Sequence, residues 1–178
     1  MADFNLFYRE YNSFISTFKK TSFDSENNFH LCKDTSVEVI DFDAIIENMY
    51  PDSNHRPKSF DSIYFDETKN HVYLIEFKNQ KKPDKQEIEK KLIDGKRELE
   101  VLLNRLSISK NSYEFIFCLV YNKFTPKEER YKRGLFKSTT FEFLNKHKET
   151  FFINDIYTED VSFFTTQFKK KTAKDLQC

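Results

Sequence analysis

The stretch that decides the fold reads KSFDSIYF at residues 58–65, DETKN at 66–70 and VYLIEFKN at 72–79. Its outer segments are rich in aromatic and β-branched residues and predict strands at 60–65 and 72–77, while the polar segment between them predicts a turn. Two strands joined in this way form an antiparallel hairpin. The second strand is apolar at Val72, Leu74 and Ile75, which is typical of a strand that is covered on both faces.

This hairpin would bring three chemically useful side chains to one end. Asp61 lies near the start of the first strand, and Glu76 and Lys78 lie near the end of the second. Because side chains alternate along a strand, Glu76 and Lys78 point to the same face. Two carboxylates at this place would bind Mg²⁺ through oxygen, with Mn²⁺ as a substitute. Such an ion polarises a phosphodiester and lowers the pKa of a water, and Lys78 would hold that water or offset charge on the phosphate.

The segments before the hairpin predict a helix, a strand and a short helical turn. Aromatic residues at steps of three and four predict a helix at 4–19, with Asp3 as its N-cap. A strand is predicted at 37–42, and a short helix or turn at 43–50.

A long helix is predicted after the hairpin. Asp84 and Glu87 form a capping box, and leucines follow at helical spacing. Gly95 inside this helix costs about 1 kcal/mol relative to Ala, which indicates close packing at that position. An apolar strand is predicted at 113–121. The remaining predictions are a helix at 138–147, a short strand at 151–153, a helix at 159–170 and a frayed tail at 171–178.

These elements predict one α/β domain over residues 1–178, since a chain of this length fits a single core. A hairpin followed by a crossover helix and another strand implies a mixed β-sheet flanked by helices. We place the core at about 4–121, and the C-terminal helical additions at about 122–170, ahead of the tail.

The composition excludes several classes of function. Only 2 of the 178 residues are Gly, which excludes a Gly-rich phosphate loop. The 29 basic and 29 acidic residues cancel, so any contact with nucleic acid depends on local clustering. Cys32, Cys118 and Cys178 fit neither a disulfide framework nor a zinc site, which favours a reducing cytoplasm. Because no long apolar run or leader is visible, we expect neither a membrane span nor export.

Together these residues resemble the PD-(D/E)XK nuclease superfamily, which includes restriction enzymes, Holliday-junction resolvases and repair nucleases. Asp61 matches the lone aspartate of the motif, and Glu76-Phe77-Lys78 matches its acid-any-lysine part. The order of elements over 4–121 is similar to the helix, three-strand meander, helix and strand of that core. The motif proline is replaced by Phe60, and Pro57 lies earlier. The resemblance implies a restriction-endonuclease-like fold and an Mg²⁺-dependent endonuclease, with DNA favoured over RNA.

The family often uses a further acid upstream of the motif. Glu10, Glu38, Asp41 and Glu47 are candidates, and we favour Glu38 as the third metal ligand. Some viral cap-snatching endonucleases with a similar core add a histidine ligand, and His30 lies where it could serve.

A local excess of basic residues follows the motif. From Lys78 to Arg97, eight basic residues oppose four acidic residues. Such an excess could meet phosphates, although a solvated helix face is the better explanation for most of these residues. We expect Lys91 and Lys58 to contact phosphate.

Two other interpretations stay open. A nuclease-like fold could serve only to bind nucleic acid or a partner protein, which the zero net charge and the missing motif proline allow. Alternatively, Glu76 and Lys78 form a simple ion pair at a strand end, and Asp61 is a turn residue. A cleft for duplex DNA often needs two subunits, so a homodimer is consistent with the nuclease hypothesis.

Overall fold

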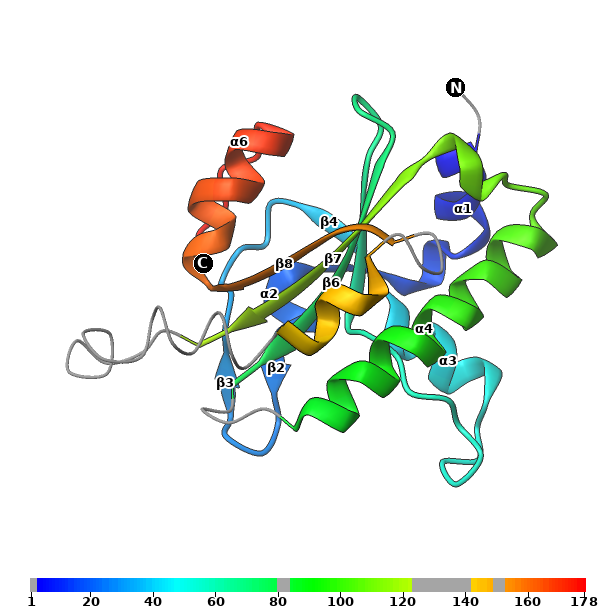
Figure 1. Ribbon diagram of the computed structural model, residues 1–178, viewed down its shortest axis with the longest axis horizontal. Coiled ribbons are helices and arrows are strands. Elements are labelled where there is room, and N and C mark those ends of the chain that lie inside the picture. Colours follow the sequence, from blue (N-terminus) through cyan, green and yellow to red (C-terminus); the bar gives the residue numbers. More distant parts are fainter. Residues whose placement is uncertain (1–2, 80–83, 123–141, 149–152) are drawn as a thin grey trace.

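The hairpin predicted from the sequence lies at the centre of a six-stranded sheet in the computed structural model, which describes residues 3–79, 84–122, 142–148 and 153–178 (Figure 1). The strands lie in the order β1-β4-β5-β6-β7-β8. Their bounds are Ile15–Thr17 (β1), Glu38–Asp41 (β4), Ser62–Asp66 (β5), His71–Lys78 (β6), Glu114–Tyr121 (β7) and Ile153–Asp160 (β8). The first four pair antiparallel, and β7 and β8 are added in parallel. The predicted mixed sheet of an α/β protein is therefore confirmed.

The β5–β6 hairpin is buried on both faces. Ser62 pairs with Ile75 at one end, and Asp66 pairs with His71 beside the turn. Asn70 closes this turn with a φ of 56°, in the left-handed region that Asn tolerates. Every residue of β5 is buried, and so is every residue of β6 except His71. Asp61 directly precedes the first residue of β5, so it lies at the same end of the hairpin as the last residues of β6.

Helices cover both faces of the sheet (Figure 1). On one side lie α1 (Asp3–Glu10), α3 (Phe42–Met49) and α4 (Lys85–Arg105), and on the other lie α2 (Phe18–Thr21) and α6 (Lys169–Thr172). Short 3-10 segments occur at Asn12–Phe14, Lys110–Ser112 and Glu142–His147. A separate two-stranded hairpin consists of β2 (Phe23–Asp24) and β3 (Phe29–His30). None of the helices in the described part of the chain is both long enough and apolar enough to span a membrane.

Gly95 brings α4 against the segment that leads into β5. A Cβ built on Gly95 would lie 2.8 Å from Cδ1 and 2.9 Å from Cε1 of Phe60. Phe60 is fully buried and stacks on Phe42 of α3, with ring centroids 4.5 Å apart. The predicted close packing at Gly95 is thus confirmed, and it places α4 directly beside Asp61.

The predicted helix at 4–19 is wrong beyond Glu10. Its aromatic residues serve two separate cores: Phe7 packs under the face that α1 covers, whereas Phe18 packs under the opposite face. The chain passes from one face to the other through the 3-10 turn at Asn12–Phe14 and the edge strand β1. One helix could not have reached both faces. The helical spacing of the aromatic residues therefore led to a wrong prediction for the segment after Glu10.

The C-terminal region differs from its prediction in three ways. Of the strand predicted at 151–153, residues 151–152 lie outside the described residues, and Ile153 begins β8, which continues to Asp160 and completes the sheet, so the region is not purely helical. Helical structure begins at residue 162 rather than 159 and includes a π-helical stretch at Phe164–Phe168. Of the helix predicted at 138–147, residues 138–141 lie outside the described residues, and Glu142–His147 is a 3-10 helix.

The tail does not fray, and two of the cysteines are joined. Leu176 is 2% exposed. The backbone N–H of Gln177 donates to Asp34 Oδ2 at 3.1 Å. Cys178 forms a disulfide with Cys32, 146 residues away. The expectation of three unpaired cysteines is therefore wrong, because a pairing across such a separation leaves no local pattern in the sequence.

Candidate functional site

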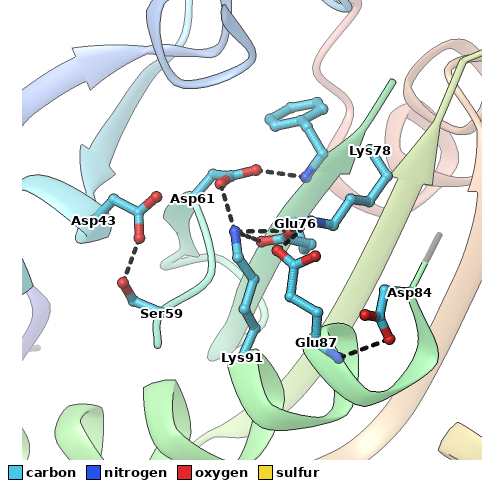
Figure 2. Close-up of polar contacts among 9 residues, drawn as sticks. Asp43, Ser59, Asp61, Glu76, Lys78, Asp84, Glu87 and Lys91 are labelled. Atoms are coloured by element: carbon cyan, nitrogen blue, oxygen red, sulfur yellow. Dashed lines mark hydrogen bonds and ion pairs between the residues drawn. The ribbon is translucent and has the colours of Figure 1, made fainter. Parts of the chain in front are cut away.

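Asp61, Glu76 and Lys78 converge at one end of the β5–β6 hairpin (Figure 2). The backbone N–H of Phe77 donates to Asp61 Oδ2 at 2.6 Å, which fixes the aspartate against the end of β6. Glu76 and Lys78 share one face of the strand, and Lys78 Nζ lies 3.2 Å from Glu76 Oε1. The arrangement expected from the folding of the hairpin is thus present.

Lys91 reaches from α4 into the gap between the two acids (Figure 2). Its Nζ lies 2.9 Å from Glu76 Oε1, 3.0 Å from Glu76 Oε2 and 3.5 Å from Asp61 Oδ1. The side chains of Asp61, Glu76 and Lys91 are only 15%, 0% and 14% exposed. Lys91 was expected to meet phosphate, and in this structure its ammonium group is the counter-ion of two buried carboxylates.

Burial dominates the electrostatics of these acids. Burial raises the pKa of Asp61 well above its usual range, and the neighbouring Glu76 raises it further, although Lys91 opposes the shift. The pKa of Glu76 is also raised by burial, against the opposing effect of Lys91 and Lys78. For Lys91, burial alone would lower the pKa, but the charges of Glu76 and Asp61 outweigh it and raise the value. Lys91 therefore remains charged at neutral pH.

Asp43 is a third acid at the site that sequence reasoning missed. It lies in the first turn of α3 and accepts a hydrogen bond from the Ser59 hydroxyl (Figure 2). The N–H of Phe42 donates to the Asp61 carbonyl at 3.1 Å, which holds the start of α3 against Asp61. Burial raises the pKa of Asp43, and Lys91 acts to lower it. Asp41 caps α3 through the Ala44 N–H, which marks the start of the helix, but the contact of α3 with Asp61 left no local signal in the sequence.

Glu87 is a second residue that was not predicted to belong to the site. Asp84 caps α4 by accepting from the N–H groups of Gln86 and Glu87, at 2.9 and 3.4 Å, which confirms the predicted helix start. The Glu87 carboxylate lies 3.0 Å from Lys78 Nζ. Burial would lower the pKa of Lys78, but Glu76 raises it and the hydrogen bond to Glu87 adds to that effect, so the net shift is upward.

Glu38 and Lys58, the other two predicted site residues, lie outside this cluster. Glu38 is exposed and pairs with Thr17 at the far end of β4. At about 3.3 Å per residue, Glu38 lies about 10 Å along β4 from Asp41. Asp41 is the residue of β4 that pairs with Ser62, which directly follows Asp61. The backbone N–H of Lys58 donates to Asp94 at 3.3 Å, and the charge of Lys58 acts on Glu87, so Lys58 borders the site.

The remaining candidates have other partners. Glu10 is exposed at the end of α1, and Glu47 pairs with Arg56 at 2.5 Å. The Nδ1 of His30 lies 2.6 Å from the Lys19 carbonyl oxygen, and none of the contacts described for His30 is with the acidic cluster.

The cluster is rich in negative charge. Four carboxylates, those of Asp43, Asp61, Glu76 and Glu87, surround the two ammonium groups of Lys78 and Lys91, which leaves two negative charges when all six groups are ionised. Glu76 Oε1 is buried and forms no hydrogen bond of good geometry, although both ammonium groups are nearby.

Asp61 and Glu76 supply the carboxylates that could hold a divalent cation at the cluster. Within the described ranges, no three Asp, Glu, His or Cys side chains are grouped closely enough to form a metal site as they stand. Lys91 Nζ lies between the two carboxylates of Asp61 and Glu76. Carboxylate oxygens are nevertheless the ligands that Mg²⁺ prefers, and Glu76 Oε1 is buried without a hydrogen bond of good geometry. The donor set therefore suits the ion.

A pocket of about 280 Å³ opens beside the cluster. One wall consists of Asp61, Phe77, Lys78, Asn79 and Glu87, and the other consists of residues 21–26 with Leu31. Asp61, Glu87 and Lys78 are thus accessible from one side, through a cleft between the end of β6 and the β2–β3 hairpin, whereas the fully buried Glu76 does not line this pocket.

Comparison with known protein families, with curated proteins and with solved structures gave no match. The assignment of function therefore depends on the geometry of the site.

Proposed function

We propose that this chain is a metal-dependent endonuclease that hydrolyses phosphodiester bonds in nucleic acid, DNA in preference to RNA, on a restriction-endonuclease-like core. One observation carries the proposal: the buried carboxylates of Asp61 and Glu76 converge at a hairpin end with Lys78 beside them. Burying two acids together is unfavourable unless a cation is bound, and such perturbed groups beside a cleft are typical of active sites.

The order of strands supports the proposed core. From β4 to β8 the strands lie side by side in chain order, as a meander followed by a crossover helix and parallel strands. The family that the sequence resembles has the same succession of elements. The acids lie where β6 ends, and the helix that follows supplies Lys91.

Each side chain has a role in the proposed hydrolysis. Asp61 and Glu76 would hold Mg²⁺, with Asp43 nearby, and the bound ion would polarise the phosphodiester and lower the pKa of a water. The Phe77 N–H keeps Asp61 oriented. Lys78 Nζ lies 3.2 Å from Glu76 Oε1, so its ammonium group lies beside the proposed metal ligand. It stabilises the negative charge that develops on the phosphate, and Glu87 holds it in position.

Cleavage assays test this proposal. Plasmid, linear duplex, single-stranded DNA and RNA would be incubated with Mg²⁺, Mn²⁺ or EDTA. We expect metal-dependent cleavage that is lost in Glu76→Gln and Lys78→Ala, with Glu67→Gln as a control because Glu67 is an exposed turn residue. Full activity of either site variant, or cleavage in EDTA, would refute the assignment.

A second function is favoured by the position of Lys91. An ammonium group that already neutralises Asp61 and Glu76 is what a binding module without metal would need. On this alternative, the fold binds nucleic acid or a partner protein without cutting. Calorimetry with Mn²⁺ separates the two, because the module would bind none at the acids.

A further inference from the structure

The β2–β3 hairpin presents an aromatic ring at the mouth of the site. Phe23 is 44% exposed, which is a large exposure for an aromatic residue in a structured hairpin. His30 pairs with it across the hairpin, and their ring centroids are 4.6 Å apart at an angle of 36°. The ring of Phe23 is thus supported from one side and open to solvent on the other.

Phe23 lines the same pocket as Asp61, Lys78 and Glu87 of the cluster. Phe23 lies on one wall, and Asp61 and Lys78 lie on the other. The volume of about 280 Å³ is just below the range of about 300–1,000 Å³ that is usual for drug-sized ligands, so the pocket suits a single nucleoside-sized group.

Hydrogen bonds fix the hairpin relative to the acids. Asn79, which follows β6, donates through Nδ2 to Asp24 Oδ2 at 2.9 Å, and it accepts from Asn122 Nδ2 at 2.8 Å. Asp24 also accepts from the side chain and backbone of Asn27, which closes the turn. The ring of Phe23 is therefore held at a set position beside the reacting groups.

The charges in the pocket determine which part of a nucleotide would meet Phe23. Asp24 and Glu26 line the wall around the ring and repel a phosphate. On the opposite wall Lys78 is the basic side chain among the lining residues, and a metal ion at the neighbouring Asp61 would offset the negative charge of that wall, so the phosphate would lie there. A nucleobase is uncharged and flat, and it stacks on an aromatic ring whatever its identity. The base would lie against Phe23 while the adjoining phosphate lies at Lys78.

We propose that Phe23 is the stacking platform for one unpaired nucleobase next to the phosphate that is cut. The proposal rests on the proposed nuclease function and refines its substrate to single-stranded nucleic acid or an unpaired nucleotide. A base within a duplex lies between its neighbours and cannot enter such a pocket unless it is flipped out, which costs free energy.

Phe23→Ala tests the platform, and Phe29→Ala is its matched control. Phe29 is 40% exposed on the same hairpin but does not line the pocket. For a single-stranded oligonucleotide, loss of one stack should raise KM by about 5- to 150-fold in Phe23→Ala, with little change in kcat. Phe29→Ala should match the wild type, and Phe23→Trp should restore KM. An unchanged KM in Phe23→Ala would overturn the proposal.

A binding assay separates failure of the platform from failure of the nuclease. Fluorescence anisotropy would follow a labelled single-stranded oligonucleotide and the same strand in a duplex, with Ca²⁺ in place of Mg²⁺. If the wild type does not cleave but binds the single strand in a Phe23-dependent way, the platform is supported and the nuclease is not. Equal binding by the wild type and Phe23→Ala would refute the platform, whether or not the protein cleaves.

Discussion

Replacing Lys91 by Met is the most informative single change at the site. Met has a side chain of similar length but no charge, so two buried carboxylates lose the ammonium group that lies 2.9–3.5 Å from them. Removing one partner of a buried ion pair costs about 3–5 kcal/mol because the other charge is left uncompensated. We expect the free energy of unfolding at neutral pH in EDTA to fall by this amount.

The loss of stability in Lys91→Met should grow as the pH rises. The pKa values of Asp61 and Glu76 in the folded protein are already raised by burial, and Lys91 holds them down. Without Lys91 they rise further above the ordinary carboxyl value of about 4. The folded variant therefore binds protons that the unfolded chain releases, and its stability falls as pH rises from that value through the raised pKa values. The variant should approach the wild type at acidic pH.

Divalent metal should reverse the effect. A metal ion and the ammonium group of Lys91 compete for the same carboxylates, so Mn²⁺ should bind more tightly to Lys91→Met than to the wild type. Metal at about 100 times its Kd adds about 2.7 kcal/mol to the free energy of unfolding. The assays are urea unfolding with EDTA or Mg²⁺, and calorimetry with Mn²⁺.

Lys90→Met is the control, because Lys90 is exposed on the same helix. It should change neither stability nor metal affinity. If Lys91→Met in EDTA is as stable as the wild type, or if metal stabilises both proteins equally, Lys91 is not the counter-ion of the two acids.

Two further changes test the packing of α4 and the anchoring of the tail. Gly95→Ala gains about 1 kcal/mol of helix propensity but places a methyl group 2.8 Å from the buried ring of Phe60, so a net loss of up to about 2 kcal/mol should lower the urea midpoint. An unchanged or raised midpoint would show that Phe60 can move aside. Cys178→Ser opens the disulfide to Cys32 and should lower the free energy of unfolding by about 2–5 kcal/mol in the absence of reductant. The wild type with reductant should be as unstable as Cys178→Ser. Equal stability of the oxidised wild type, the reduced wild type and the variant would show that the disulfide does not anchor the tail.

The hairpin and its acids could be predicted from the sequence because their determinants are local. The polar turn, the apolar strands and the capping box each lie within a few residues, and alternation then fixes the face of Glu76 and Lys78. Close packing at Gly95 could also be predicted, because a glycine within a helix lowers stability relative to Ala and therefore indicates a packing reason. Local patterns therefore gave the centre of the sheet and two acids of the site.

The rest depended on contacts that no local pattern records. Asp43 joins the site because α3 docks against the start of β5, which its own segment does not reveal. The aromatic residues of the first segment are divided between two cores, and their spacing resembles that of one helix. Cys32 and Cys178 meet only when the chain is fully folded.

The position of Lys91 has a consequence for the order of folding. The hairpin that carries Asp61 and Glu76 is closed by a local turn, whereas the ammonium group of Lys91 reaches the two acids only when α4 packs on the sheet. Until then the two carboxylates lack the ammonium group that lies between them, although Lys78 of the hairpin lies beside Glu76. Docking of α4 is therefore the step at which the repulsion between the two carboxylates is relieved, and the helix that completes the core also determines when the acids can ionise together.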